Sequence, residues 1–381
     1  MLRIAPPFGA AAAAMLMLAS VAGAGVTNPN ISVVGQPFMR WSDEAGEARK
    51  RMILDPGETE FVYDDYLNPY ARGFFTIALG EERAEVEEGF FNLLRGLPAG
   101  LALKGGKYRL GFGKLNPVHP HAYPFAERFR VLQYLPGGEA FNETALQLSE
   151  RIPAPGDVAI TASADWLQGN TFRFARESTG DLTDPIEVAG PDGDGDRAGE
   201  PRPAGLGRLS AFVPISDRSG LELGFSGTSG TNNVAARTRT TVLGGDLKLK
   251  LWTSANAYLL VQGEALRLNF ERADWDPANT VYTKSSLEPT GGYLYADYNF
   301  KVRYNVGASY ERYQQVTPDK TWDQAFGLYA GLALLEETTA FRLDWNRFMQ
   351  GSPSGQPEPD AVNTVTLRVI YSMGPHKAHQ F

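Results

Sequence analysis

Two pairs of histidines are the residues in this chain best suited to binding a metal ion. His119 and His121 flank a single proline, and His376 and His379 lie in the C-terminal tail. Imidazole is a common metal ligand and suits zinc. We expect the first pair to diverge on an extended loop, so a carboxylate such as Glu127 has to complete any zinc site there. The alternative is that His-Pro-His is a rigid loop motif that packs against the protein and binds no metal.

Three aspartates form a second candidate metal site, this time for calcium. Asp192, Asp194 and Asp196 alternate with glycines, and spaced carboxylates with glycine bends suit this ion. The full calcium-loop pattern fails, because Arg197 replaces the usual glycine and Pro203 stands at the twelfth position. A solvated external loop rich in Pro, Gly and Asp is the alternative. The chain has no cysteine, which excludes disulfides and thiolate metal sites.

A run of charged residues indicates a third kind of chemistry, the selection of solutes. They cluster where a glycine-rich strand gives way to a polar, aromatic loop. Such a mixture suits the constriction of a pore, where walls of low dielectric focus the local field. The alternative is that the charges pair with one another and only stabilise the wall. The candidate pore residues are Lys104, Lys107, Arg109, Lys114, Glu127, Arg128 and Arg130.

Enzymatic chemistry and nucleic-acid binding have little support in the sequence. No set of nucleophile, base and acid stands out, so we expect a protein that is not an enzyme. An outer-membrane enzyme remains a third hypothesis, because catalytic triads assemble in space and not in sequence. The net charge of -8, from 36 Lys and Arg against 44 Asp and Glu, argues against nucleic acid as a partner.

The elements that must position these residues are β-strands. Runs of about ten residues in which apolar and polar side chains alternate recur along the chain, separated by turns, as in outer-membrane barrels. The pattern predicts an all-β fold, a transmembrane antiparallel β-barrel of 16 strands. Because the second strand is weak, 14 strands is the alternative. The predicted strands are 30–40, 58–66, 72–80, 85–95, 100–113, 141–152, 157–168, 206–216, 220–229, 240–252, 257–271, 291–300, 302–314, 323–334, 339–349 and 362–373.

The connections between these strands alternate between short and long. If both termini are periplasmic, the long connections all lie on the outer face, as barrels require. We expect the 114–140 loop to fold from there into the barrel. The alternation slips between Ala265 and Leu266, which predicts a β-bulge. Val365, Leu367, Val369 and Tyr371 are predicted to face lipid. The long connections are 41–57, 114–140, 169–205, 272–290 and 350–361.

Aromatic residues near strand ends predict girdles at the two water–lipid interfaces. They are Tyr258, Phe270, Tyr310, Tyr313, Trp322, Trp345 and Tyr371. Residues 1–24 combine one positive charge, an apolar run and an Ala-Gly-Ala cleavage site, which indicates a secretory signal peptide. The barrel domain is then 25–381, and its expected location is the outer membrane.

Three stretches resemble a known family. They are NPYARGFFTIAL, VEEGFFNLLRGLPAGLALKGGKYRLGFGKLNPVHPHAYPF and SMGPHKAHQF, which cover about residues 68–135 and the last ten. They are similar to a Gram-negative outer-membrane family whose members are loosely labelled zinc-regulated TonB-dependent receptors. The order of strands and loops resembles the phosphate-selective porin O and P superfamily. This resemblance implies a 16-stranded barrel.

These observations favour a porin-like outer-membrane channel for passive diffusion of small hydrophilic solutes or ions, constricted by the 114–140 loop. The alternative is a closed barrel that binds a ligand or a metal, with zinc as the metal. We expect no cofactor beyond such a zinc or calcium ion. The expected partners are outer-membrane lipid, lipopolysaccharide and the barrel-assembly machinery, with a homotrimer as one arrangement of the chain.

Overall fold

The computed structural model describes residues 30–44, 52–80, 84–133, 140–173, 187–188, 196–197, 201–276, 278–279, 281–334 and 338–374. The predicted signal peptide, His376, His379, Asp192 and Asp194 lie outside these residues, and only the backbone of Asp196 is described. The expected calcium site therefore stays a prediction. None of the described helices is long and apolar enough to cross a membrane.

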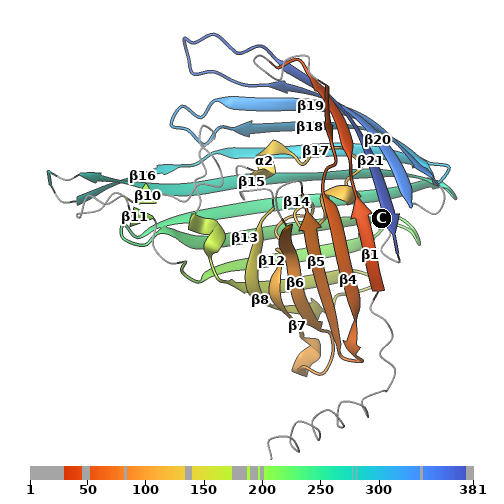
Figure 1. Ribbon diagram of the computed structural model, residues 1–381. Helices are drawn as coiled ribbons and strands as arrows, with labels where there is room; N and C mark the ends of the chain where they lie inside the picture. Colours follow the sequence, from red (N-terminus) through yellow and green to blue (C-terminus); the bar gives the residue numbers. More distant parts are fainter. Residues whose placement is uncertain are drawn as a thin grey trace, which may run out of the picture.

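Nearly all of the described chain is β-strand, with a few single-turn helices (Figure 1). The strands are β1 (Asn30–Gly35), β2 (Phe38–Ser42), β3 (Met52–Asp55), β4 (Thr59–Asn68), β5 (Ala71–Leu79), β6 (Ala84–Leu93), β7 (Ala102–Arg109), β8 (Asn142–Ile152), β9 (Ala159–Leu167), β10 (Glu187–Val188), β11 (Asp196–Arg197), β12 (Ala204–Pro214), β13 (Gly220–Asn233), β14 (Thr238–Ser254), β15 (Ala257–Asp276), β16 (Val281–Leu287), β17 (Thr290–Phe300), β18 (Tyr304–Gln314), β19 (Trp322–Leu334), β20 (Thr339–Met349) and β21 (Val362–Met373). The helical turns are η1 (Pro98–Gly100), η2 (Pro120–Ala122), α2 (Arg130–Leu132) and η4 (Asn170–Arg173).

The strands form one closed antiparallel barrel of 16. Three barrel strands are each interrupted by a short break, so that β1 and β2 form one strand, β3 and β4 the next, and β16 and β17 another. The last strand, β21, pairs with β1 and β2 and closes the barrel. β10 and β11 form a separate two-stranded sheet. The prediction of 16 strands is confirmed, and the alternative of 14 is wrong.

The connections alternate between the two ends of the barrel, because each strand is antiparallel to its neighbours. Short turns such as 69–70 and 255–256 lie at one end, and the connections 110–141, 168–203 and 350–361 lie at the other. One expected loop is wrong: 272–290 is mostly a hairpin, since β15 continues to Asp276 and pairs with β16. This hairpin projects beyond the neighbouring strands in Figure 1.

Side chains alternate between the lumen and the outer surface. On β21, Thr366, Arg368 and Ile370 are buried inside the barrel, so the residues between them point to the outer surface, which is the surface predicted to face lipid. The outer surface carries exposed apolar residues on strand after strand, while the inner surface buries carboxylates. Exposed apolar residues include Leu146, Leu148, Phe225, Leu243, Leu294, Val306, Phe326 and Leu343, and buried carboxylates include Glu60, Asp165, Asp246, Glu264, Asp297 and Asp344.

The predicted bulge in β15 is wrong. Its pairing with β14 runs without a register shift through Ala265 and Leu266, and the inward face stays the same. What changes there is the polarity of the lumen, from Glu264 to the apolar Leu266 and Leu268. These leucines are buried in a cluster with loop residues, so an apolar residue in this strand faces either lipid or the loop.

The aromatic girdle is only partly present. Tyr310, Trp322 and Tyr371 are exposed on the outer surface, as expected for residues at an interface with lipid. Tyr258, Phe270 and Tyr313 are instead buried inside the barrel, where they belong to the same apolar cluster as the loop. The prediction is therefore wrong for these three residues, because the sequence does not show which face of a strand a loop covers.

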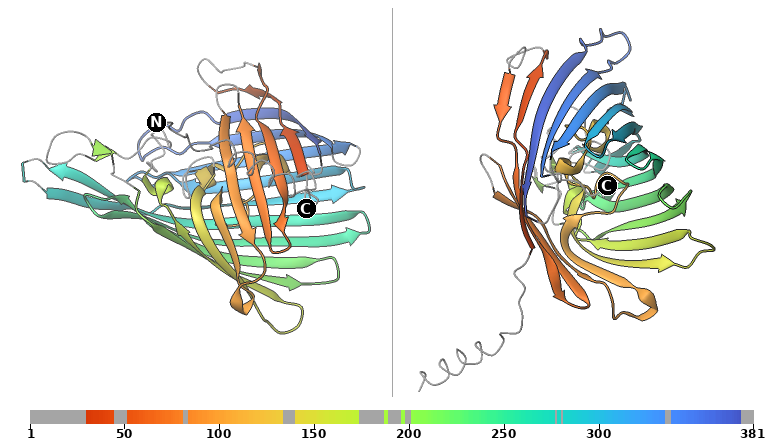
Figure 2. Two further views of the ribbon diagram at one scale, coloured as in Figure 1. Left: turned by 60° about the horizontal axis from the view of Figure 1, so that its bottom comes forward. Right: turned by 90° about the vertical axis from the view of Figure 1, so that its right-hand side faces the viewer.

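The described residues of the connection 110–141, which are 110–133 and 140–141, lie inside the barrel. Figure 2 shows the strands curving around a central space that this segment enters. Its described residues bond to wall residues far away in the chain: the amide of Ala126 donates to Asp344, 218 residues later, and Arg342 donates to the carbonyl of His121. The predicted inward fold of the loop is therefore present, with bounds slightly wider than the expected 114–140.

Candidate functional site

The loop is closed at its base by one buried asparagine. The Asn116 amide group donates to the carbonyls of Leu110 (2.9 Å) and Phe141 (3.0 Å), and its oxygen accepts from the amide of Phe141 (2.8 Å). Arg128 donates to the same oxygen at 3.0 Å. These bonds satisfy backbone groups that no strand reaches, which a buried segment requires. The two ends of the loop are thereby held together where they leave the wall.

One side of the loop is an apolar and aromatic surface. Phe129 stacks on Tyr293 with ring centroids 4.1 Å apart, and Phe125 meets the face of Tyr295 at 5.1 Å. Both loop rings are almost fully buried. Aromatic pairs of this geometry add about 0.5–1.5 kcal/mol each beyond the burial of their area. Strands β13–β19 therefore hold this side of the loop by packing.

Glu264 on β15 adds a polar anchor within this apolar contact. Its carboxylate accepts from the amides of Lys114 (2.7 Å) and Leu115 (2.8 Å) and from the Tyr293 hydroxyl (2.7 Å). Gly113 has φ +65°, and a Cβ there would collide with the same carboxylate. The glycine-rich sequence before the loop thus allows the backbone to approach Glu264 closely.

The opposite side of the loop faces acidic residues that a β-bulge presents. The pairing of β5 with β6 shifts between Thr76 and Ile77, so that Glu87 is the extra residue between Val86 and Glu88. In a bulge two residues oppose one on the partner strand, which disrupts the alternation of side chains. Glu87 and Glu88 accordingly both turn inward, with side chains 13% and 7% exposed.

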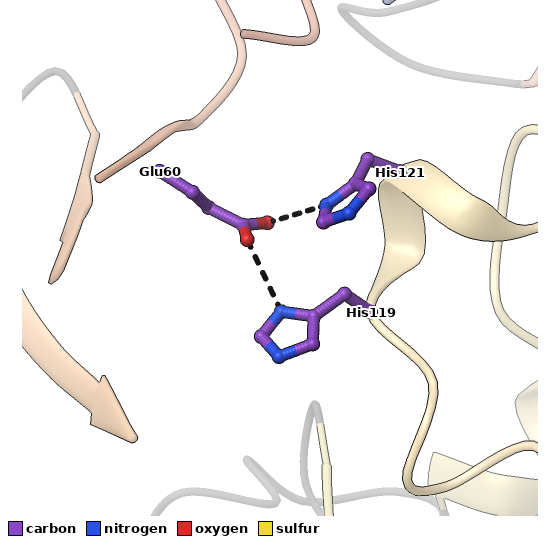
Figure 3. A group of neighbouring side chains, drawn as sticks. All are labelled: Glu60, His119 and His121. Carbon is purple, nitrogen blue, oxygen red and sulfur yellow. Dashed lines mark hydrogen bonds and ion pairs between the residues drawn. The ribbon is translucent and has the colours of Figure 1, made fainter. Parts of the chain in front are cut away.

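His119 and His121 meet a third inward carboxylate, Glu60 on β4 (Figure 3). His119 Nδ1 lies 3.1 Å from Glu60 Oε2, and His121 Nδ1 lies 3.1 Å from Glu60 Oε1. The imidazole rings are 5.5 Å apart. The expected divergence is wrong, because Pro120 begins the turn η2 and brings the second ring back beside the first. The carboxylate beside the histidines is Glu60, whereas Glu127 pairs with Arg40 at 2.5 Å.

The other nitrogen of His119 is also engaged. Nε2 donates to Glu88 Oε2 at 2.7 Å, and Glu88 Oε1 accepts from the Arg109 amide at 2.8 Å. The Arg109 guanidinium forms an ion pair with Glu87. Burial opposes the charged form of His119, but the carboxylates of Glu60 and Glu88 outweigh it and raise the pKa of His119 to about 9. The cluster is thus a dense, buried network of charges between loop and wall.

A cavity of about 840 Å³ opens between the polar side of the loop and the strands near both ends of the chain. Its lining mixes charges of both signs, with five basic and five acidic side chains. Four of the seven predicted pore residues line it, namely Lys107, Arg109, Glu127 and Arg128. The lining charges are Arg40, Lys107, Arg109, Arg128, Arg368, Asp55, Glu58, Glu85, Glu87 and Glu127.

The other three predicted pore residues lie elsewhere on the loop and wall. The Lys104 ammonium sits over the rings of Phe90 (3.7 Å) and Tyr108 (4.0 Å), and Lys114 forms an ion pair with Glu222. Arg130 lies over the ring of Phe348 at 3.8 Å and lines a smaller cavity of about 160 Å³. The basic run is therefore distributed around the loop.

Sequence reasoning missed Glu60, Glu87 and Glu88. Glu60 lies 61 residues before His121, and only the closing of the barrel brings them together. A usable signal was present in β6, where two adjacent glutamates interrupt an alternating strand. Such an interruption indicates a bulge with both side chains on one face.

Comparison with known proteins gives one sequence relative. No protein-family model matches the chain. A protein of Aquifex aeolicus (strain VF5), described only as uncharacterised, is 29% identical over 281 residues. The match covers 70% of this chain and 56% of the relative. The chain thus spans little more than half the length of that relative.

Solved structures of outer-membrane proteins share the fold. The anion-selective porin from Comamonas acidovorans has a TM-score of 0.57 at 10% identity, covering 90% of this chain and 98% of that one. The outer membrane channel DcaP of Acinetobacter baumannii has a TM-score of 0.56 at 10% identity, and the match covers 90% of this chain and 96% of that one. The trimer form of OmpT, an outer membrane protein of Vibrio cholerae, has a TM-score of 0.53 at 10% identity, and the match covers 90% of this chain and 98% of that one. This likeness shows the fold: the chain folds into a β-barrel like those of outer-membrane porins. It lends no support to the label of a TonB-dependent receptor.

Proposed function

We propose that this chain is a passive channel for small hydrophilic solutes or ions, and that it is not an enzyme. The observation that carries the proposal is the loop 110–141 inside a closed 16-stranded barrel, beside a cavity of about 840 Å³ lined by charges of both signs. A barrel of this strand number encloses an aqueous lumen unless loops fill it. The loop is then the constriction, and solutes pass along its polar side.

Opposed charges at the cavity suit polar solutes in particular. Arg40 and Arg368 approach from β2 and β21, while Glu85 and Glu87 approach from β6. Between low-dielectric walls such charges create a field across the pore. A polar molecule can align with this field, whereas an apolar one loses its contact with water and gains nothing.

Removing the tip of the loop tests the constriction. Deletion of residues 118–128 should raise single-channel conductance in a planar bilayer and shift the ion selectivity, because the charged side of the loop is lost. A matched control removes 353–357 from the exposed connection 350–361, which should leave conductance unchanged. Equal conductance of wild type and 118–128 deletion, in assembled barrels, would overturn the proposal. A wild type that conducts nothing would favour the closed ligand-binding barrel.

We also propose that the channel assembles as a homotrimer, with lipid and lipopolysaccharide around its outer surface and with the barrel-assembly machinery inserting it. The trimer form described for the Vibrio cholerae protein of similar fold supports this arrangement. Light scattering of the purified protein in detergent should give three chains per particle, and a mass of one chain would contradict it.

A further inference from the structure

We propose that Glu60, His119 and His121 bind a Zn²⁺ ion that fastens the loop to the wall of the barrel. Each of the three offers one ligand atom, and these atoms lie within 4.8 Å of one another. Two imidazoles and a carboxylate form a ligand set that suits zinc, while calcium and magnesium prefer oxygen ligands alone.

Unsatisfied atoms point into this site. Glu60 Oε2, Glu87 Oε2 and His119 Nδ1 are buried, and none makes a hydrogen bond of acceptable geometry with any residue that the structure describes. The two carboxylate oxygens lie 3.1 Å and 3.4 Å from His119 Nδ1, so the three atoms contact one another as ion pairs. The Glu60 side chain is 99% buried, since only 1% is exposed. Buried polar atoms are usually hydrogen-bonded, so three such atoms side by side support a bound ion at this place.

Individual distances between the atoms are close to those in a zinc ligand shell, although the two imidazoles approach different oxygens of Glu60. With bonds of about 2.0–2.1 Å, the edges of a tetrahedron of ligands are about 3.3 Å long. Each imidazole Nδ1 lies 3.1 Å from an oxygen of Glu60, and His119 Nδ1 lies 3.4 Å from Glu87 Oε2. An ion can therefore enter with small side-chain movements.

Glu88 holds the ring of His119 in the orientation that a metal needs. A ligating imidazole commonly donates its second N–H to a carboxylate, which fixes the tautomer and the ring. Here Nε2 donates to Glu88, and Glu88 is fixed in turn by the Arg109 amide. This contact directs Nδ1 toward Glu60 and Glu87, and a Zn²⁺ ion that binds there has to displace the proton on this nitrogen.

The charges of the cluster fit a divalent cation. With neutral imidazoles, the carboxylates of Glu60, Glu87 and Glu88 against the guanidinium of Arg109 leave two negative charges in a buried place. One Zn²⁺ neutralises them, and any proton held between an imidazole and Glu60 is released as the ion binds. The ion can arrive through the large cavity, since Glu87 lines it.

The test is a titration of the full-length chain with Zn²⁺ alone, after purification in detergent and removal of metal by a chelator. Calorimetry should show one Zn²⁺ per chain for wild type, with affinity at least about 10-fold lower for Glu60→Gln and for His119→Gln. Glu88→Gln, which keeps all three ligands, should lower the affinity by about 10–100-fold. Glu264→Gln is the matched control: it alters a buried carboxylate that anchors the loop from the opposite wall, and it should bind zinc like wild type.

Assembly of each variant is checked by its heat-dependent mobility on a gel, and only assembled protein is titrated. If the Glu60 and His119 variants do not assemble, the test rests on the Zn²⁺ affinity of Glu88→Gln compared with that of wild type. Co²⁺ added to wild type should then give visible absorption bands that equimolar Zn²⁺ abolishes. Wild type that binds no Zn²⁺, or binds it no more tightly than the assembled Glu60, His119 and Glu88 variants, would overturn the proposal. Because conductance is not measured, this outcome is independent of the channel function.

Discussion

The two sides of the loop 110–141 are held by different interactions, apolar packing on one side and ion pairs on the other. Toward β13–β19 the loop buries aromatic rings, such as Phe125 and Phe129, against wall tyrosines. Toward β2–β6 it presents His119, His121 and Glu127 to charged wall residues beside a large cavity. Apolar packing does not depend on ions or solutes, whereas ion pairs at an open cavity are sensitive to both. The first side therefore fixes the position of the loop, and the second sets the properties of the space beside it.

Truncating the aromatic side should have the largest effect. Phe129→Ala removes a ring that is 6% exposed and stacked on Tyr293, so we expect the docked loop to lose about 3–5 kcal/mol relative to the free loop. Amide hydrogen exchange of the 110–133 peptides, measured by mass spectrometry, should become much faster. Phe225→Ala is the control, because that ring is 57% exposed on the lipid side. Unchanged exchange in Phe129→Ala would show that packing does not hold the loop.

Truncating the charged side should scarcely change the stability of the loop. Arg40 and Glu127 pair at 2.5 Å, but their side chains are 34% and 47% exposed, and such pairs contribute about 0–1 kcal/mol. The effect should instead appear in ion selectivity, with opposite signs for the two variants. Arg40→Ala should shift the reversal potential toward cations, and Glu127→Gln should shift it toward anions.

Arg267→Ala is the control for this pair, because Arg267 pairs with Glu288 on the outer surface of the barrel. It removes the same charge without touching the cavity and should leave selectivity unchanged. Shifts of equal sign in the Arg40 and Glu127 variants would contradict the role that we give to the charged side. Much faster amide hydrogen exchange of the loop in either variant would also contradict it.

The strands could be predicted from the sequence because their signal is local. Alternation over ten residues sets each strand, and the number of strands follows from counting. The same local signal fails where the environment of a strand changes along its length. At Leu266 the alternation of polar and apolar residues changes phase, although the strand has no register shift there. The reason is that the lumen becomes apolar where the loop packs. A single sequence does not distinguish an apolar residue facing lipid from one facing a buried loop.

The candidate site was predictable only in part, and for a related reason. The histidines stand out by their type, but their carboxylate partners lie 31 and 61 residues earlier in the chain. The register of strand pairing and the closure of the barrel decide which inward-facing residue contacts the loop. Neither can be predicted from the sequence of the loop. The adjacent residues Glu87 and Glu88 indicate a bulge in the sequence of β6. The face of the barrel to which their side chains point depends on the pairing with β5, which the sequence of β6 does not show.

The loop also has a consequence for how the chain folds. It bonds to Glu60 and Glu88 on early strands. On late strands it bonds to Glu311, Arg342 and Asp344, over separations of up to 221 residues. Folding slows as the mean sequence separation of contacts rises, because each distant contact requires the closure of a long stretch of chain. Full docking of the loop therefore has to wait until β20, which carries Arg342 and Asp344, has come close to it. The bonds of the loop to β4 and to β20 therefore link its docking to the closure of the barrel.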